Sequence, residues 1–142
     1  LRGYREALRD LDIEWTAEWE LAGSFTEASG YEAARRFLAL GTRPEALFAS
    51  NDSMAIGALS ALREAGLRVP KDVAVGGFDD IPMARYTSPP LTSVRVPMGE
   101  LGAQAVDLLV LALRKEGRHH ALRQTLPTTL VVRGSCWGTA EG

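Results

Sequence analysis

The sequence contains a single cysteine, Cys136, among 142 residues. One thiol cannot form an internal disulfide, which excludes a disulfide-stabilised scaffold, and the scarcity of cysteine favours a reducing compartment. No apolar run approaches the roughly 18 residues that a membrane-spanning helix needs, and the first residues lack the pattern of a signal peptide. We therefore expect a cytoplasmic protein with no membrane partner.

Basic residues are not in excess either. The chain carries 16 Lys and Arg against 18 Asp and Glu, a net charge of −2. Because binding to phosphate backbones requires clustered basic side chains, we expect no nucleic-acid surface in this chain. His119 and His120 lie in a basic stretch without cysteine or acidic ligands at metal spacing, which favours a solvated loop over a metal site. We expect no metal and no cofactor.

With 46% apolar and 24% charged residues, the chain has the composition of a globular domain. Apolar periodicity predicts helices over 1–11, 28–40, 52–65 and 97–116, and strands over 15–21, 46–50, 73–78, 91–96 and 129–133. Strands separated by such helices pair in parallel. The predicted fold class is therefore α/β, a parallel sheet flanked by helices.

Two details sharpen this pattern. In the helix predicted over 52–65, one apolar stripe faces the core and consists of Ala55, Ala58, Leu59 and Leu62, and Gly66 follows where a helix-ending glycine belongs. The first predicted helix starts at Leu1 without a methionine and without a capping residue before it. We expect a segment of a longer protein.

Polar and aromatic side chains occupy three loops that follow predicted strands: Ser24 and Phe25, then Ser50, Asn51 and Asp52, then Asp79 and Asp80. Ligands of open α/β sheets bind beyond the carboxyl ends of the strands. A carboxylate, an amide and an aromatic ring suit a sugar-like polyol, because the carboxylate accepts hydroxyl protons and the ring covers C–H groups. The alternative is local capping of the next helix or turn by these same polar residues.

Motifs for catalysis are weak. Gly134–Trp137 matches the sequence around a papain-type nucleophile, but that site requires a histidine and an asparagine roughly 130 residues downstream, and five residues follow Trp137. Val75–Phe78 lacks the third glycine of a dinucleotide-binding loop. We expect no enzyme; a hydrolase using Cys136 or an aspartate pair is the weakest alternative.

The segment from Ala46 to Pro97 contains five features in a fixed order. These are a strand ending in Asn-Asp, an apolar helix, Gly-x-x-Val-Pro, a strand ending in Phe-Asp-Asp, and Pro-x-Leu-Thr. In this series, and in Gly3-Tyr4, Ser29–Tyr31 and Leu126-Pro127, the chain resembles the effector-binding core of the LacI/GalR transcriptional regulators. The resemblance extends over essentially the whole length.

The resemblance implies a periplasmic-binding-protein-like fold, type I, with two subdomains around an effector cleft. It assigns residues 1–90 and 125–137 to the C-terminal subdomain, whose first strand would precede Leu1. Residues 91–96 would be a crossover, and 97–120 a helix of the N-terminal subdomain. The DNA-binding domain would lie outside this chain.

Carried over by position, Asp79 corresponds to the carboxylate that holds effector hydroxyls, Asn51 to its polar neighbour, and Phe25 to the aromatic that packs on the effector ring. Ser24 and Val96 are further candidates that depart from the family pattern. Relatives often have an acidic residue in place of Ser24 and a glutamine in place of Val96. An arginine that contacts the effector in relatives would fall before Leu1.

The implied function is effector sensing, most simply of a sugar, by a LacI-type repressor. The implied partners are that effector, operator DNA through the absent domain, and a second copy in a homodimer. An uncovered strand edge and the inner face of the helix over 97–116 also predict dimerisation or strand exchange. The alternative is the sugar-binding receptor of an ABC transporter, which shares the fold, although Leu91–Val94 is closer to the regulators.

Overall fold

The computed structural model describes residues 1–40, 44–114 and 123–136. Along the described chain the elements are α1 (Arg2–Asp10), the 3-10 helix η1 (Ala17–Trp19), α2 (Glu27–Leu38), β1 (Ala46–Phe48), α3 (Asp52–Glu64), β2 (Ala74–Asp79), the 3-10 helix η2 (Pro82–Tyr86), β3 (Thr92–Arg95), α4 (Met98–Arg114) and β4 (Thr129–Val131). Several predicted features lie outside the described residues, namely the end of the last helix at 115–116, His119, His120 and Trp137.

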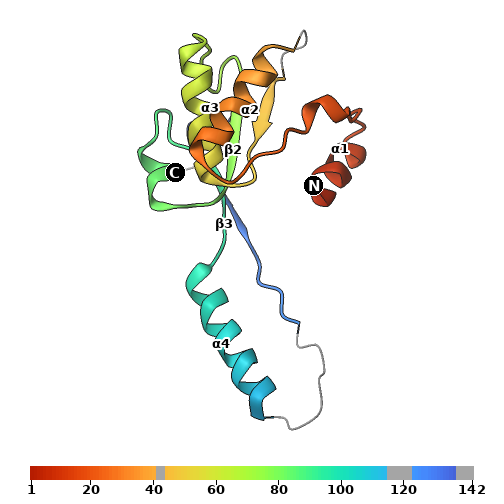
Figure 1. The fold of residues 1–142 in the computed structure, drawn as a ribbon, viewed down its shortest axis with the longest axis vertical. Coiled ribbons are helices and arrows are strands. Elements are labelled where there is room, and N and C mark those ends of the chain that lie inside the picture. Colours follow the sequence, from red (N-terminus) through yellow and green to blue (C-terminus); the bar gives the residue numbers. More distant parts are fainter. Residues whose placement is uncertain (41–43, 115–122, 137–142) are drawn as a thin grey trace.

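The four strands form one sheet in the order β1-β2-β3-β4. β1, β2 and β3 are parallel, with Leu47 opposite Val75 and Phe78 opposite Val94, whereas β4 runs antiparallel to β3. Helix α3 packs on β2, and α2 packs on α3 (Figure 1). This confirms the predicted α/β class, with β4 making the sheet mixed.

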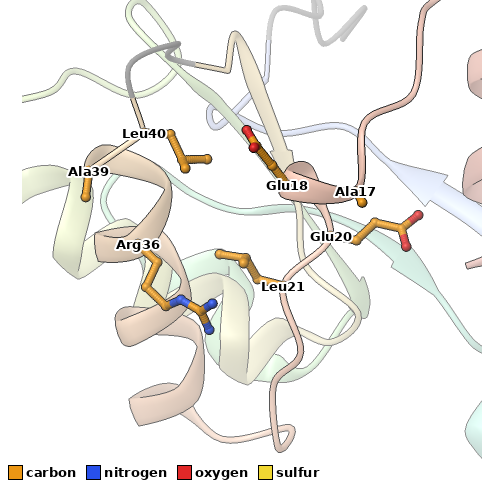
Figure 2. A pocket seen from close by; sticks show the side chains of 7 residues that line it. All are labelled: Ala17, Glu18, Glu20, Leu21, Arg36, Ala39 and Leu40. Atoms are coloured by element: carbon orange, nitrogen blue, oxygen red, sulfur yellow. The ribbon is translucent and has the colours of Figure 1, made fainter.

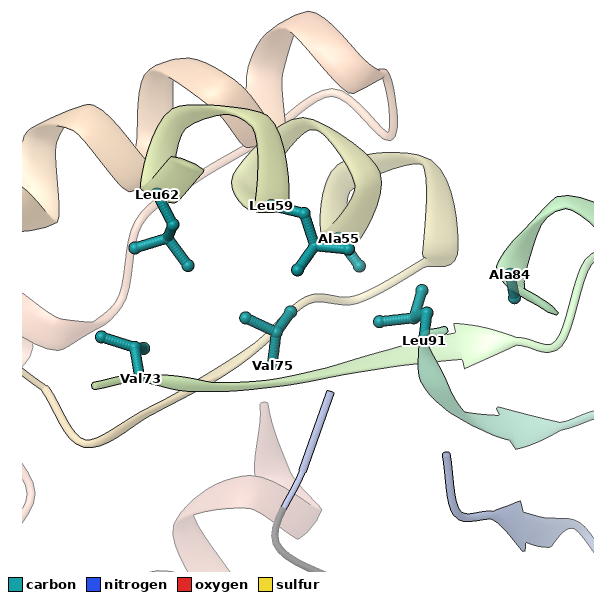
Figure 3. Packing of buried hydrophobic residues seen from close by; sticks show 7 residues of the cluster. All are labelled: Ala55, Leu59, Leu62, Val73, Val75, Ala84 and Leu91. Carbon is teal, nitrogen blue, oxygen red and sulfur yellow. The ribbon is translucent and has the colours of Figure 1, made fainter. Parts of the chain in front are cut away.

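The hydrophobic core lies between α3 and the centre of the sheet. Figure 3 shows Ala55, Leu59 and Leu62 of α3 facing Val75 of β2, with Leu91 beside them. The stripe predicted on α3 is confirmed, since all four of its residues are buried. Full burial of a leucine contributes about 1.5–3 kcal/mol, so this layer fixes α3 on the sheet.

Two glycines allow α2 and α3 to approach each other closely. A Cβ atom on Gly30 would overlap the Met54 backbone, and one on Gly57 would overlap the Glu27 carbonyl. Gly66, at φ +73°, ends α3 in the left-handed conformation predicted for it. The close crossing holds the start of α2 beside the start of α3.

The strand predicted over 15–21 is wrong: the segment contains the short helix η1, with extended residues on either side. A strand requires a partner, and β1 pairs only with β2 among the described strands. The segment is held instead by side chains. Arg5 and the Trp15 indole both donate hydrogen bonds to the Glu20 carboxylate, and the Arg5 guanidinium lies 4.6 Å from the centre of the Trp15 ring.

Helix α4 projects away from the α/β body at the ends of β3 and β4 (Figure 1). It begins at Met98, one residue later than the start predicted at Pro97. None of its described side chains is buried, and its exposed apolar residues include Leu101, Leu109 and Leu113. No described helix combines the length and apolarity that spanning a bilayer requires.

The helix crossing gives a direct test. Gly57→Ala should lower the free energy of unfolding of this chain by about 1–3 kcal/mol, because the added methyl group forces α2 away from α3. Gly102→Ala in α4 is the matched control, because its Cβ would meet open space, and removal of a helix glycine should stabilise by about 0.5–1 kcal/mol. Urea unfolding measures both, and equal effects would contradict the close crossing.

Candidate functional site

The polar residues of the three candidate loops, which we call the rim, lie where the three parallel strands end. β1, β2 and β3 run in the same direction, so the residues that follow them, among them Asn51, Asp80 and Val96, meet at one edge of the sheet. Val96 is half-buried one residue beyond β3. The rim predicted from the sequence is therefore formed by the topology.

Asn51 has two structural contacts at once. Its Oδ1 accepts a hydrogen bond from the Met54 backbone N–H at 2.9 Å, so it caps α3. Its Nδ2 donates to the Phe25 carbonyl oxygen at 3.0 Å. The capping interpretation of Asn51 is thus confirmed, and the same amide fixes the neighbouring loop. One N–H of the amide remains after these two contacts.

The loop before α2 reaches this rim although no strand precedes it. Phe25 is held at φ 61°, in the left-handed region that non-glycine residues rarely adopt, and its side chain is 66% exposed. Ser24 is exposed, with its hydroxyl 3.3 Å from that of Thr26. A Thr26–Ser29 capping box anchors the start of α2 directly behind this loop.

Asp52 is fully buried under the rim. Its Oδ1 accepts a hydrogen bond from the Ser93 hydroxyl at 2.6 Å, and its Oδ2 accepts one from the Ile81 backbone N–H at 2.8 Å. Gly77 makes room for it, because a Cβ there would overlap Asp52 Oδ1. The carboxylate therefore links α3 to the loop after β2 and to β3, a role beyond the helix cap that its position predicted.

Asp79 is the last residue of β2, and its carboxylate accepts no hydrogen bond from any other described residue. Its φ of 103° is far from ordinary strand values, a conformation that costs of order 1–3 kcal/mol and is kept where the surroundings enforce it. Burial raises the pKa of the Asp79 carboxyl, and the charge of Asp52 raises it further. Both effects disfavour its negative charge while no donor faces it.

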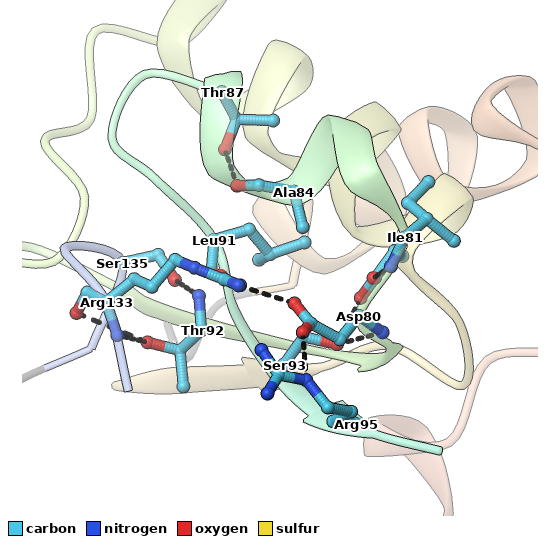
Figure 4. A network of polar contacts seen from close by, with 11 residues as sticks. Asp80, Ile81, Ala84, Thr87, Leu91, Thr92, Ser93, Arg95, Arg133 and Ser135 are labelled. Carbon is cyan, nitrogen blue, oxygen red and sulfur yellow. Dashed lines mark hydrogen bonds and ion pairs between the residues drawn. The ribbon is translucent and has the colours of Figure 1, made fainter. Parts of the chain in front are cut away.

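Asp80 has the opposite environment (Figure 4). Its Oδ1 accepts a hydrogen bond from Arg133 Nη2 at 2.6 Å and its Oδ2 from Arg95 Nε at 2.7 Å. The Asp80 side chain is 3% exposed and that of Arg133 13%. Burial opposes ionisation of Asp80, but the two arginines outweigh it and hold its pKa below the ordinary value.

The structure thus separates the candidates. A hydrogen bond joins Asn51 to Phe25. Asp79 lies close enough to Asp52, the residue after Asn51, for the charge of Asp52 to raise the pKa of Asp79. Sequence reasoning missed Arg95 and Arg133. The signal available for Arg133 was a charged side chain directly after the apolar run Leu130–Val132, because a charge in such a place needs a partner.

Two other features lie apart from the rim. The Cys136 thiol donates to the Val75 carbonyl oxygen at 3.2 Å, a contact that secures the chain after β4 on the sheet. An open hollow of about 490 Å³ lies between the η1 segment and the end of α2, with Leu21 and Arg36 among its lining (Figure 2). Since α2 begins at the rim, a hollow at its far end is not part of the rim.

Known proteins are similar to this chain over most of its length. The family description "periplasmic binding protein-like domain" matches residues 1–136. A lactose operon repressor from Rhizobium radiobacter is 48% identical over 75% of this chain and 93% of its own length. The chain belongs to the LacI/GalR family. The transcriptional repressor PurR from Histophilus somni is 37% identical over 94% of this chain but 40% of its own length, so the chain spans about two fifths of such relatives.

A solved structure of a transcriptional regulator has the same fold. The transcriptional regulator CelR in complex with cellobiose superposes with a TM-score of 0.88 and 41% identity, over 94% of this chain and 40% of that one. The resemblance and the periplasmic-binding-protein-like fold are therefore confirmed. Because the matched relatives are transcriptional repressors, not enzymes, they favour a regulator over the receptor of a transporter.

The Asp80 pair gives a pH test. The pKa of Asp80 is lower in the folded chain than the value of about 3.9 expected in the unfolded chain. The ionised carboxylate therefore stabilises the fold fully at pH values above about 3.9. This contribution to the free energy of unfolding is lost as the pH falls through the pKa of Asp80 in the folded chain. Asp80→Asn should lower the free energy of unfolding by about 3–5 kcal/mol at neutral pH. The difference in the free energy of unfolding between this variant and the wild type should shrink below about pH 4.

Urea unfolding across pH measures this difference. The control is Asp72→Asn, which removes a pair with exposed Arg68. Solvent screens that pair, so its loss should cost less. A destabilisation of Asp80→Asn that does not change with pH would show that the charge of Asp80 is not what stabilises the site.

Proposed function

We propose that this chain is the effector-sensing part of a LacI-type transcriptional repressor and that its rim binds a sugar. The observation that carries the proposal is the half-buried Asp79 carboxylate, which has no donor in the described residues although its neighbours Asp52 and Asp80 are fully paired. The hydroxyl groups of a sugar would supply the hydrogen-bond donors that this carboxylate lacks among the described residues.

The chemistry of the other candidates is complementary. Asn51 retains an amide N–H beside the rim, and the exposed Phe25 ring offers an apolar face to C–H groups. Ser24, which precedes Phe25, and Val96, which follows β3 at the same edge of the sheet, would vary the shape of the site. The regulator CelR, whose structure contains cellobiose, is 41% identical to this chain, which supports a saccharide as the effector.

The division of the chain follows from the same proposal. Residues 1–90 and 125–137 would form the C-terminal subdomain and 91–96 a crossover, and the helix of 97–120 would belong to the N-terminal subdomain. The apolar side chains that α4 exposes, such as Leu109 and Leu113, support this assignment, since an amphipathic or apolar helix face needs a partner surface.

In the intact protein we propose a cytoplasmic homodimer that contacts operator DNA through a separate domain. A sugar at the rim would favour one relative orientation of the two subdomains. If operator DNA favours the other orientation, binding of the sugar lowers the affinity for DNA. The size of this effect is limited by the difference in the affinity of the sugar for the two orientations. No residue of the rim needs to perform covalent chemistry for this function.

The test is calorimetry on the full-length protein with a panel of mono- and disaccharides that includes cellobiose. Asp79→Ala should weaken the binding sugar about 100-fold or more, because two hydrogen bonds to a charged group are lost. The fold should remain, since Asp79 holds no partner among the described side chains.

The matched control is Asp12→Ala, an aspartate that also has a positive φ but lies after α1. It should leave the sugar affinity unchanged. Unchanged affinity in Asp79→Ala would refute the site, and absence of any saccharide binding by the wild type would refute the proposed effector class.

A further inference from the structure

β3 connects the α/β body with α4 in the described structure, through Val96 and Pro97. β4 runs antiparallel to β3, with Arg95 opposite Thr129 (Figure 1). The position of α4 relative to the body therefore depends on how β3, with β4 paired beside it, leaves the sheet. A group that fixes both strands would control that position.

Asp80 is such a group. One carboxylate oxygen accepts from Arg95, the last residue of β3 on the side of α4. The other accepts from Arg133, which follows β4 at the opposite end of the strand pair. Arg133 also donates through Nη1 to the Leu91 carbonyl oxygen at 2.7 Å, which ties it to the start of β3. Figure 4 shows Asp80 between the two arginines.

Asp80 is also rigidly connected to Asp79. The two residues have consecutive positive φ values, 103° and 56°, so their backbone forms one tight bend. The Asp80 N–H donates to the Ser93 hydroxyl at 3.0 Å, and the next N–H, of Ile81, donates to Asp52. Because Asp79 and Asp80 share one bend, a change in the Asp79 backbone on ligand binding would also move the Asp80 carboxylate.

We propose that Asp80 is a positioning residue that transmits sugar binding at Asp79 to the angle between the body and α4, through its ion pairs with Arg95 and Arg133. This inference depends on the proposed function for its effector. The two arginines differ in their environment. The Arg133 side chain is 13% exposed and also binds the Leu91 carbonyl oxygen, whereas the Arg95 side chain is 52% exposed and pairs with Asp80 from the end of β3.

The exposed arginine provides a variant that folds. In the full-length protein, Arg95→Gln removes one ion pair at the strand ends and leaves the Arg133 pair intact. Arg68→Gln is the matched control, because it removes an exposed Arg–Asp pair of similar geometry between Arg68 and Asp72, remote from β3 and β4. Arg95→Lys keeps the charge and should behave nearly as the wild type.

The first measurement needs no sugar. Nitroxide labels on Arg63→Cys in α3 and Asp107→Cys in α4, in a background with Cys136→Ser, report the distance between body and α4 by pulsed electron spin resonance. Arg95→Gln should broaden or shift the distance distribution, while Arg68→Gln should not. An unchanged distribution in Arg95→Gln overturns the inference.

The second measurement is the ratio of operator affinities without and with a saturating concentration of the sugar that binds the wild type. Arg95→Gln should reduce that ratio by about two- to thirty-fold. An unreduced ratio also overturns the inference. If no sugar binds the wild type, the proposed effector fails, and the label distances alone decide whether Asp80 sets the position of α4.

Discussion

The buried carboxylate of Asp52 is the interaction on which the rim depends. Removing a charge from water costs several kcal/mol, and this charge is offset by hydrogen bonds from Ser93 and Ile81. Those partners belong to β3 and to the loop after β2, while Asp52 itself begins α3. One buried group therefore fixes three segments to one another, and Gly77 is required so that the carboxylate fits beneath them.

The close packing of α2 on α3 extends this order to the aromatic part of the site. Gly30 and Gly57 remove the side chains that would separate the two helices. The start of α2 is then near Asn51, whose amide holds the Phe25 carbonyl. The rim combines a rigid floor with exposed contact groups, which suits a ligand site, since the contact groups are positioned before the ligand arrives.

Much of the fold follows from local patterns in the sequence. The stripe of α3 and the glycine at its end favour a helix through local interactions, because periodicity and φ preferences act over a few residues. The apolar runs of β1 and β2 are similarly local. The segment over 15–21 is different, because strand formation depends on a partner edge that its own residues do not specify. In the structure this segment is held by hydrogen bonds of Glu20 with Arg5 and Trp15 instead of by strand pairing.

The sequence by itself determined most of the alternation of helices and strands and the family, and it predicted a group of polar residues for the rim. It could not assign separate roles to Asp79 and Asp80, two identical side chains in adjacent positions. Tertiary structure decided that, because Arg133 and Arg95 approach Asp80 from β4 and β3 while no described donor reaches Asp79. Desolvation and pairing depend on neighbours distant in sequence, and only the folded chain brings these neighbours together.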